Sequence, residues 1–332
     1  VTQRVVVENN GSISGSLGGE IIFTEYDDVI LNPGSRVDAV INPGKVSVGE
    51  TEVYGISAAN DLVIDGAEVS VTIRPDYVFY SRTNQMIAPL VGLRSVNGKT
   101  EINESKVNID ITGFNVPKYG YNQFATSVCA IEGKYIDLDD SRIDINADSL
   151  GFNDVKGIYA GAMDVDNCDL NIFARGYSNV AGILGVYNLS NVVTGEIDLN
   201  NSKVRVKTYA EVVIGDDMGD VPYLDAGIRA RELNITLDTD SYVEVETNRA
   251  SALVVQYDKS TTEVKPYAGY VPQYLTFNDV DIISDTYEVN LDYYDSFSSA
   301  EQRSFHIVCE SLYAPEDYNT HITKVLLTAK SN

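Results

Sequence analysis

The chain has no tryptophan and holds only three cysteines, two histidines and nine prolines in 332 residues. Cys129, Cys168 and Cys309 are odd in number and widely spaced, which excludes a disulfide-stapled framework and a paired-cysteine metal motif. We expect Cys129 and Cys168 to be buried free thiols. His306 and His321 lack a metal-ligand partner or a nucleophile signature, and no apolar run approaches the ~18 residues of a transmembrane helix.

Positive charge is also scarce, because 24 Lys and Arg stand against 49 Asp and Glu, a net charge of −25. This balance argues against nucleic acid and against anionic membrane surfaces as partners. It is typical of a soluble protein that is secreted or displayed on a surface. The chain begins at Val1 rather than Met, so we expect a trimmed mature chain without its targeting segment. We therefore predict an extracellular or cell-surface location, with no membrane insertion in this segment.

What the sequence does contain is one signature repeated seven times. It opens with a Gly or Ala followed by Ile or Leu, at Gly55-Ile56, Gly92-Leu93, Ala130-Ile131, Gly157-Ile158, Gly182-Ile183, Gly227-Ile228 and Ala252-Leu253. An apolar residue, a turn pair, a small residue and an alternating apolar run then follow, starting at Ile64, Ile102, Leu138, Val165, Leu199, Leu237 and Phe277. A recurring unit of this kind predicts a solenoid.

Each unit shows the two-residue period of a β-strand on both sides of a turn. The slot after the turn is small, which indicates an inward position with little room: Ala67, Ser105, Ser141, Cys168 and Ser202. The turn itself opens with Asp or Asn in every unit, at Asp65, Asn103, Asp139, Asp166, Asn200, Asp238 and Asn278. These residue types tolerate left-handed backbone and form local hydrogen bonds, so we expect a structural ladder of Asp and Asn rather than catalytic residues.

The spacing between successive turns varies from 27 residues (Asp139 to Asp166) to 40 (Asp238 to Asn278), so inserts vary while strands keep their length. A left-handed hexapeptide helix and a leucine-rich repeat need stricter repeats, and a β-sandwich would not repeat one signature in this way. We predict an all-β, right-handed parallel β-helix with capping segments at both ends. Within one continuous domain, we expect a cap and early coils at 1–53, a seven-unit body at 54–284 and a C-terminal cap at 285–332.

The repeat resembles the pectin-lyase-like β-helix superfamily over roughly residues 20–284. Members of that superfamily are often polysaccharide lyases or glycoside hydrolases, and others are adhesins, phage tailspikes or bacterial surface proteins. Here Asp-Asp pairs occur at 27–28, 139–140 and 216–217, without the Asn-Thr-Asp, His-Gly and Arg-Ile-Lys segments of polygalacturonase-like members. The resemblance therefore implies the fold and leaves no catalytic residue assigned.

Pectate-lyase-like members need a basic residue and calcium held by clustered acids. Arg94 and Arg229 are expected to be four coils apart, about 19 Å by the ~4.8 Å strand spacing, too far to act together. We expect ordinary solvent surface along the outward stack at Ser57, Arg94, Glu132, Tyr159, Leu184, Arg229 and Val254. Acid-rich segments at 137–140, 164–169 and 237–240 raise calcium as a ligand, but none has an EF-hand loop. Solvated turn acids are the favoured interpretation, so we assign no cofactor and no metal ligand.

Four long inserts rich in tyrosine interrupt the repeat, at 74–90, 112–127, 207–225 and 256–274. The first three follow the same strand of the coil and should emerge along one edge, whereas the fourth follows a different strand. Tyrosine suits stacking on sugar rings or protein interfaces, and it equally suits packing of the inserts onto the solenoid wall. The candidate ligand-binding residues are Tyr77, Tyr80, Tyr119, Tyr121 and Tyr209.

The leading hypothesis is a non-catalytic extracellular β-helix domain of a bacterial cell-surface protein, acting in adhesion by binding a glycan or a host or cell-surface protein. A polysaccharide lyase or glycoside hydrolase with an unfamiliar site remains open, using carboxylates within 137–169 or 211–220. A structural stalk is the third hypothesis. An enzyme should show a groove of converging acids or bases, and a binding domain a flatter aromatic surface.

Overall fold

The computed structural model describes residues 5–7, 12–17, 22–24, 27–41, 53–74, 89–112, 127–149, 154–176, 179–185, 187–188, 193–210, 226–230, 232–248, 253–255, 275–278, 280–284, 289–293, 305–309 and 323–329. These residues form β-strands, turns and bends only. Within this described part there is no helix with the length and apolarity needed to cross a membrane. The prediction of an all-β chain is confirmed.

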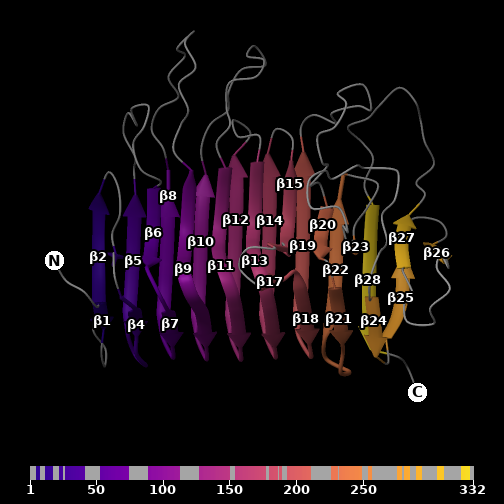
Figure 1. Ribbon diagram of the computed structural model, residues 1–332, viewed down its shortest axis with the longest axis horizontal. Helices are drawn as coiled ribbons and strands as arrows, with labels where there is room; N and C mark the ends of the chain where they lie inside the picture. Colours follow the sequence, from indigo (N-terminus) through magenta and orange to yellow (C-terminus); the bar gives the residue numbers. More distant parts are fainter. Residues whose placement is uncertain are drawn as a thin grey trace, which may run out of the picture.

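One side of every coil belongs to a ten-stranded sheet. Its order is β2 (Ser12–Leu17), β5 (Arg36–Ile41), β8 (Glu68–Ile73), β10 (Lys106–Thr112), β12 (Arg142–Ser149), β14 (Asp169–Gly176), β19 (Lys203–Ala210), β22 (Tyr242–Thr247), β28 (Thr323–Ala329) and β25 (Val280–Ser284). The strands from β2 to β22 are parallel and in continuous register, and they stand side by side along the long axis in Figure 1. β28 then pairs antiparallel with both β22 and β25.

The other two sides of the coil belong to one bent sheet of fourteen strands. Its first arm contains β3 (Ile22–Phe23), β6 (Val53–Ala58), the opening halves of β9 (Leu90–Asn103), β11 (Ser127–Asp139) and β13 (Asp154–Asp166), and then β15 (Val180–Gly185), β20 (Ala226–Ala230) and β23 (Leu253–Val255). Its second arm contains β1 (Val5–Val7), β4 (Val29–Leu31), β7 (Leu62–Asp65), the closing halves of β9, β11 and β13, and then β18 (Glu196–Asn200), β21 (Glu232–Thr236) and β24 (Leu275–Asn278). Two antiparallel pairs stand apart, namely β16 (Tyr187–Asn188) with β17 (Val193–Thr194) and β26 (Val289–Tyr293) with β27 (Phe305–Cys309).

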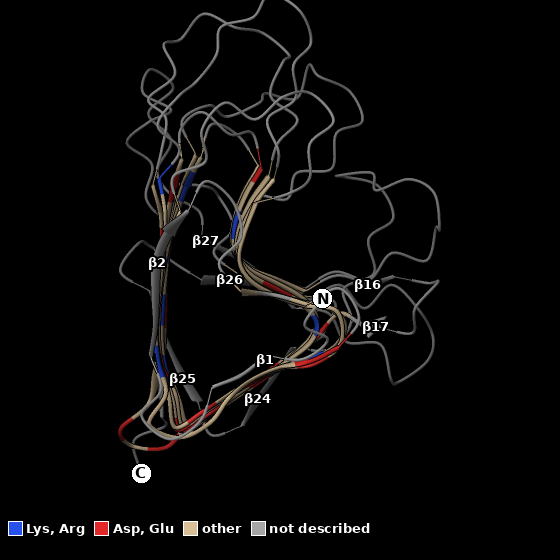
Figure 2. Ribbon diagram, turned by 90° about the vertical axis from the view of Figure 1, so that its left-hand side faces the viewer, with Lys and Arg blue, Asp and Glu red and all other residues tan. Residues whose placement is uncertain are grey.

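Viewed from the N-terminal end, the three sides enclose the core in Figure 2. The chain rises along the ten-stranded sheet, descends the first arm and returns along the second arm, turning clockwise as it recedes from the viewer. That sense of rotation makes the solenoid right-handed. The predicted right-handed parallel β-helix with three strands per coil is therefore confirmed.

The predicted interior column is confirmed at five of its six positions. Backbone register aligns these five residues, each with 0% exposure, on successive coils: Ile64, Ile102, Leu138, Val165 and Leu199. The sixth assignment was wrong, because Ile235 rather than Leu237 is in register with Leu199. The alternation around this corner fits either residue, and the corner that follows Ile235 is longer than in the preceding coils, reaching the small slot only at Ser241.

The left-handed backbone falls one residue later than the sequence indicated. Positive φ angles occur at the residue after five of the seven predicted Asp and Asn positions, at Gly66 (54°), Glu104 (46°), Asp140 (43°), Asn167 (51°) and Asn201 (47°), whereas Asp238 is not followed by one. These five Asp and Asn residues themselves end strands of the second arm. Backbone hydrogen bonds link the turns from coil to coil, for example from Glu104 N to Asp139 O at 3.1 Å.

Serine hydroxyls complete these corners as a buried ladder. Ser141 Oγ accepts the backbone N–H of Ser105 at 2.9 Å and donates to Asp139 O at 2.7 Å, and Ser105 Oγ accepts the N–H of Ala67 at 3.0 Å. Cys168 occupies the same slot in the next coil as a buried free thiol, and its burial raises the thiol pKa to about 12. The inward small slot and the free thiols at Cys129 and Cys168 are thus confirmed.

Candidate binding surface on the ten-stranded sheet

Two sides of the rod carry very different outward charges. The second arm presents a run of carboxylates, which colour it red in Figure 2: Glu101, Asp137, Asp139, Asp164, Asp166, Glu196 and Asp198. Lys99 lies among them and contacts Glu101 at 3.0 Å and Asp137 at 2.6 Å. The ten-stranded sheet instead alternates cations, anions and amides, so the two sides offer different chemistry to a ligand.

Two parallel rows of outward side chains cross the middle of the ten-stranded sheet. The first row, one residue per strand from β10 to β22, is Asn108, Asp144, Asn171, Arg205 and Glu244. The second row is Asp110, Asn146, Phe173, Lys207 and Glu246. Because parallel strands in register stack equivalent residues, each row runs along the solenoid axis with one side chain per ~4.8 Å.

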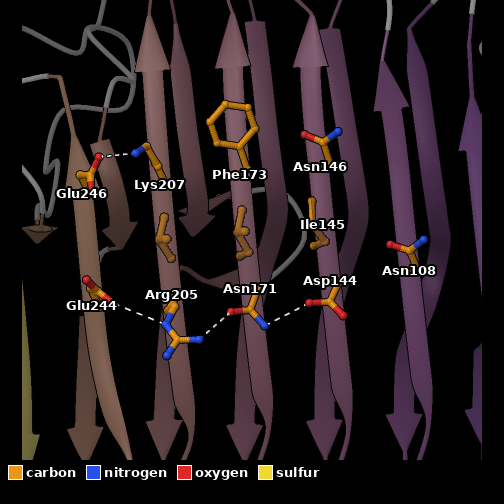
Figure 3. A pocket seen from close by; sticks show the side chains of 12 residues that line it. Asn108, Asp144, Ile145, Asn146, Asn171, Phe173, Arg205, Lys207, Glu244 and Glu246 are labelled. Atoms are coloured by element: carbon orange, nitrogen blue, oxygen red, sulfur yellow. Dashed lines mark hydrogen bonds and ion pairs between the residues drawn. The ribbon is translucent and has the colours of Figure 1, made fainter.

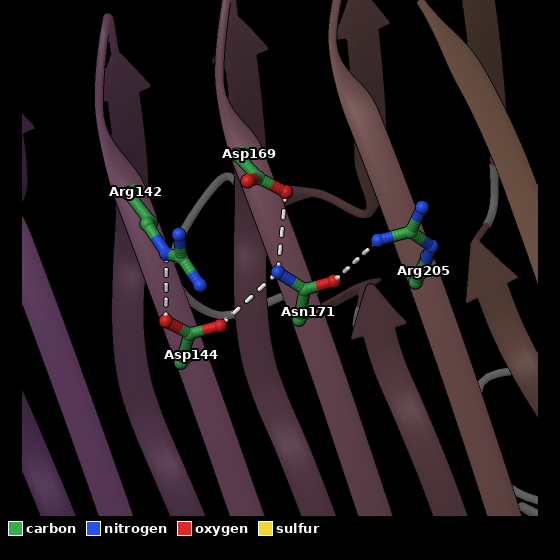
Figure 4. Close-up of polar contacts among 5 residues, drawn as sticks. All are labelled: Arg142, Asp144, Asp169, Asn171 and Arg205. Carbon is green, nitrogen blue, oxygen red and sulfur yellow. Dashed lines mark hydrogen bonds and ion pairs between the residues drawn. The ribbon is translucent and has the colours of Figure 1, made fainter.

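Hydrogen bonds and ion pairs connect the first row from strand to strand (Figure 3). Asn171 Nδ2 donates to Asp144 Oδ1 at 3.1 Å, Arg205 Nη1 donates to Asn171 Oδ1 at 3.5 Å, and Arg205 Nε lies 3.5 Å from Glu244. Two further outward residues, which are in register with each other on β12 and β14, join this network. Arg142 donates to Asp144 at 2.9 Å, and Asp169 accepts from Asn171 at 3.1 Å (Figure 4). Exposed pairs of this kind add little stability, but a connected network holds its polar groups in place.

A shallow hollow of about 380 Å³ lies over these rows. Phe173, half-buried on the outer side of β14, projects its ring between Asn146 and Lys207 in Figure 3. An aromatic ring flanked by amides and charges suits a ligand that has both an apolar side and polar groups. Sequence reasoning missed Phe173, although the alternation of Ile172 and Ala174 as inward residues already placed it outward.

A second hollow, of about 450 Å³, adjoins the first towards the N-terminus of the rod. The two share Asn108 and Asp144, and the second is also lined by Arg36, Lys106 and Arg142. Arg36 lies 3.5 Å from Glu68 of the neighbouring strand. The outer side of the ten-stranded sheet therefore presents a continuous polar track, richer in cations at one end.

Of the five predicted ligand-binding tyrosines, the structure describes only Tyr209. Tyr77, Tyr80, Tyr119 and Tyr121 lie outside the described residues. Tyr209 belongs to β19 and not to an insert, which corrects the predicted boundary at 207, because inward burial continues through Thr208 and Ala210. The three inserts do follow strands of one sheet (β8, β10 and β19), and the fourth follows β23 of the other, as predicted.

The outward stack of the first arm is not the ordinary solvent surface that we expected. Arg94 Nη1 donates to Tyr54 Oη at 2.6 Å and lies 3.7 Å from Glu132, while Leu184 is only 2% exposed. On β13, the strand that follows Glu132 in this arm, Lys156 contacts Asp154 at 2.6 Å. Its Nζ lies 5.0 Å from the centre of the Tyr159 ring. Burial raises the pKa of Tyr159 above its ordinary value.

The structure adds no metal ligand to these surfaces. Within the described part of the chain, no three side chains of the His, Cys, Asp and Glu types are grouped to hold an ion. Asp164 and Asp166 belong to the segment that the sequence suggested for calcium. The pKa of each of these carboxyl groups is raised, first by burial and then by neighbouring carboxylates. These acids are therefore crowded with like charge.

Known proteins provide no closer guide to the site. No protein-family model, no curated protein and no solved structure matches this chain. What is established is the parallel β-solenoid itself, together with the chemistry of its outer sides.

Proposed function

We propose that the chain is a non-catalytic glycan-binding domain of an extracellular, bacterial cell-surface protein, acting in adhesion, on a pectin-lyase-like scaffold. The observation that carries the proposal is Phe173, an aromatic ring at the centre of a hollow lined by Asn146, Asn171 and Arg205. The binding surface is then the outer side of the ten-stranded sheet.

The chemistry of the hollow suits a sugar. One side of a pyranose ring is formed by C–H groups that stack on an aromatic ring, and its hydroxyls need donors and acceptors around that contact. Asparagine amides supply both kinds of group, and the charged side chains beside them form stronger hydrogen bonds to hydroxyls. A flat sheet presents these groups on a rigid element, which limits the entropy that is lost on binding.

Binding, rather than bond cleavage, is favoured by how the acids of the hollow are engaged. Asp144 accepts from Arg142 and Asn171, Glu244 faces Arg205, and Glu246 contacts Lys207 at 2.5 Å. Glycoside hydrolysis needs one carboxylate poised as an acid and another as a base or nucleophile across the scissile bond. Carboxylates that are held by cations and amides within a flat surface are better suited to positioning and hydrogen bonding.

The direct test is a glycan array probed with the wild-type chain, Phe173→Ala and Tyr135→Ala. Tyr135 is a matched control, because it is a 39% exposed aromatic residue on the second arm, away from the hollow. We expect Phe173→Ala to lose about 1–3 kcal/mol of binding free energy, as for a central aromatic contact, and Tyr135→Ala to bind as the wild type does. Equal binding by all three proteins would rule out this surface as the site.

A second candidate function is a polysaccharide lyase or hydrolase, and the network on the first arm favours it. Arg94, Glu132, Lys156 and Tyr159 bring a carboxylate, two cations and a phenol onto adjacent coils. Incubation with polysaccharides and detection of reducing ends or of unsaturated product at 235 nm tests this candidate. Turnover that Glu132→Gln abolishes, with the fold intact, would favour the enzyme over the binding domain.

A further inference from the structure

We infer that the ligand of the hollow is an extended, uncharged polysaccharide chain that lies across the strands, parallel to the solenoid axis, with about one sugar per strand from β10 to β22. This inference rests on the proposed glycan-binding function and specifies its ligand. It follows from the register of the two outward rows, from the groups that they offer and from the balance of their charges.

The register supplies the direction. Both rows place one side chain on each of the strands β10, β12, β14, β19 and β22, so equivalent positions recur at the strand spacing. Five strands span roughly 19 Å by the ~4.8 Å spacing. A pyranose unit of an extended chain is about as long as this spacing, so a polymer that lies along the rows meets a new pair of side chains with each sugar.

The hydrogen-bonding groups that remain available lie on consecutive strands, Asn108 in the first row and Asn146 in the second. Asn108 is exposed, and Asn146 donates through Nδ2 to Asp110 at 2.9 Å, which leaves its Oδ1 facing the hollow. Phe173 lies one strand beyond Asn146 in the second row and offers its ring to the apolar side of a sugar. An amide, an amide and an aromatic ring on consecutive strands form a track rather than a single pocket.

Charge favours a neutral polymer. Each cation that lines the hollow already faces an anion, Arg205 with Glu244 at 3.5 Å and Lys207 with Glu246 at 2.5 Å. An acidic sugar would have to displace one of these carboxylates, and it would approach a chain whose net charge is −25. Hydroxyls can add to the same groups without breaking either pair.

The test is a calorimetric titration of the whole chain with soluble cello-, manno- and xylo-oligosaccharides of two to six sugars, beside oligogalacturonates of the same lengths. We expect the affinity for at least one neutral series to rise several-fold with each added sugar up to about five and then to level off. Phe173→Ala should weaken every length at least tenfold, whereas Asn108→Ala at the end of the track should remove only the gain from the last sugar. Tyr135→Ala and the thermal melts serve as controls.

The outcomes separate this inference from the function on which it rests. Neutral glycans that bind with the same affinity at every length, or oligogalacturonates that bind more tightly than all neutral series, would overturn the inference and leave glycan binding intact. Wild-type chain that binds none of the neutral series would also overturn it. Glycan binding that Phe173→Ala leaves unchanged would overturn the proposed surface as well.

Discussion

The ten-stranded sheet and the second arm belong to the same coils, yet their outer sides differ in charge. Inward, both are built alike from buried aliphatic residues such as Ile109 and Leu138. Outward, the sheet pairs its acids with Arg142, Arg205 and Lys207, while the second arm stacks acid on acid. The scaffold therefore tolerates either charge pattern. The difference between the two outer sides indicates which of them suits which kind of ligand.

The second arm tolerates like charge at a cost that the first row of the ten-stranded sheet avoids. Asp164 lies in register with Asp137 and Asp198 on the coils to either side. Like charges directly opposite each other on neighbouring strands are destabilising. The ten-stranded sheet places Asn171 between Asp144 and Arg205 instead, so that polar contacts link the first row from β12 to β22.

The largest effect should come from the interior that the two sides share. Ile109 and Ile145 are in register on β10 and β12 and are 0% and 4% exposed. Truncation of either to Ala should cost about 2–5 kcal/mol of unfolding free energy, because a buried aliphatic side chain leaves a cavity. Denaturant melts measure this loss, with the outward Asn108→Ala as the control. A loss below about 1 kcal/mol at both positions would contradict the inward assignment.

The sequence predicted this interior well because the repeat encodes it directly. Alternation and the small slot place Ile109, Ile145 and Ser141 correctly without any knowledge of the fold. The failures occur where two registers fit the same letters, as with Ile235 and Leu237, or where backbone geometry is shifted by one residue, as at Glu104. A pattern of residue types does not distinguish Ile235 from Leu237, since either choice buries one apolar side chain. It also does not specify which residue of a turn adopts the left-handed backbone.

The candidate site could be predicted only in part. The alternation already places Phe173 outward. Its ring becomes a candidate contact only because Asn146 and Lys207 lie beside it, and the register brings these two residues there from 27 and 34 residues away in sequence. The Arg94–Tyr54 contact on the first arm depends likewise on stacking between coils 40 residues apart. Unequal insert lengths hide such neighbours, because the sequence separation between equivalent positions changes from coil to coil.

The corner between the two sides should respond with an intermediate effect. Ser141→Ala removes the hydroxyl that accepts the N–H of Ser105 at 2.9 Å, and the buried N–H is left without that partner. We expect a loss of about 1–3 kcal/mol in unfolding free energy, the cost of an unsatisfied buried donor. Ser141→Cys, which copies the residue of the next coil, should recover part of that loss. Equal melts for Ser141→Ala and the wild type would show that the ladder contributes nothing.

The smallest expected effect comes from replacing one acid on each side of the coil, Asp164 on the second arm and Asp148 on the ten-stranded sheet. The raised pKa of Asp164 means that the folded chain binds a proton there more tightly than the unfolded chain does, so its ionisation opposes folding as the pH rises through the folded value. Asp164→Asn should therefore stabilise the fold at pH 7, by less than about 1 kcal/mol, the scale of a single cross-strand pair. That advantage should disappear below the unfolded pKa of about 4, where both proteins are neutral at this position.

On the ten-stranded sheet, Asp148 accepts two hydrogen bonds from Arg175, at 2.6 and 2.7 Å. Asp148→Asn should therefore lower stability at pH 7 by up to about 1 kcal/mol, the opposite sign to Asp164→Asn. Thermal melts of both variants between pH 4 and pH 8 measure the two effects on one scaffold. If both substitutions shift the melting temperature in the same direction at pH 7, the contrast between a paired side and a crowded side is wrong. If the signs differ at pH 7 and the Asp164→Asn advantage fades on acidification, the crowding of carboxylates on the second arm is the cause.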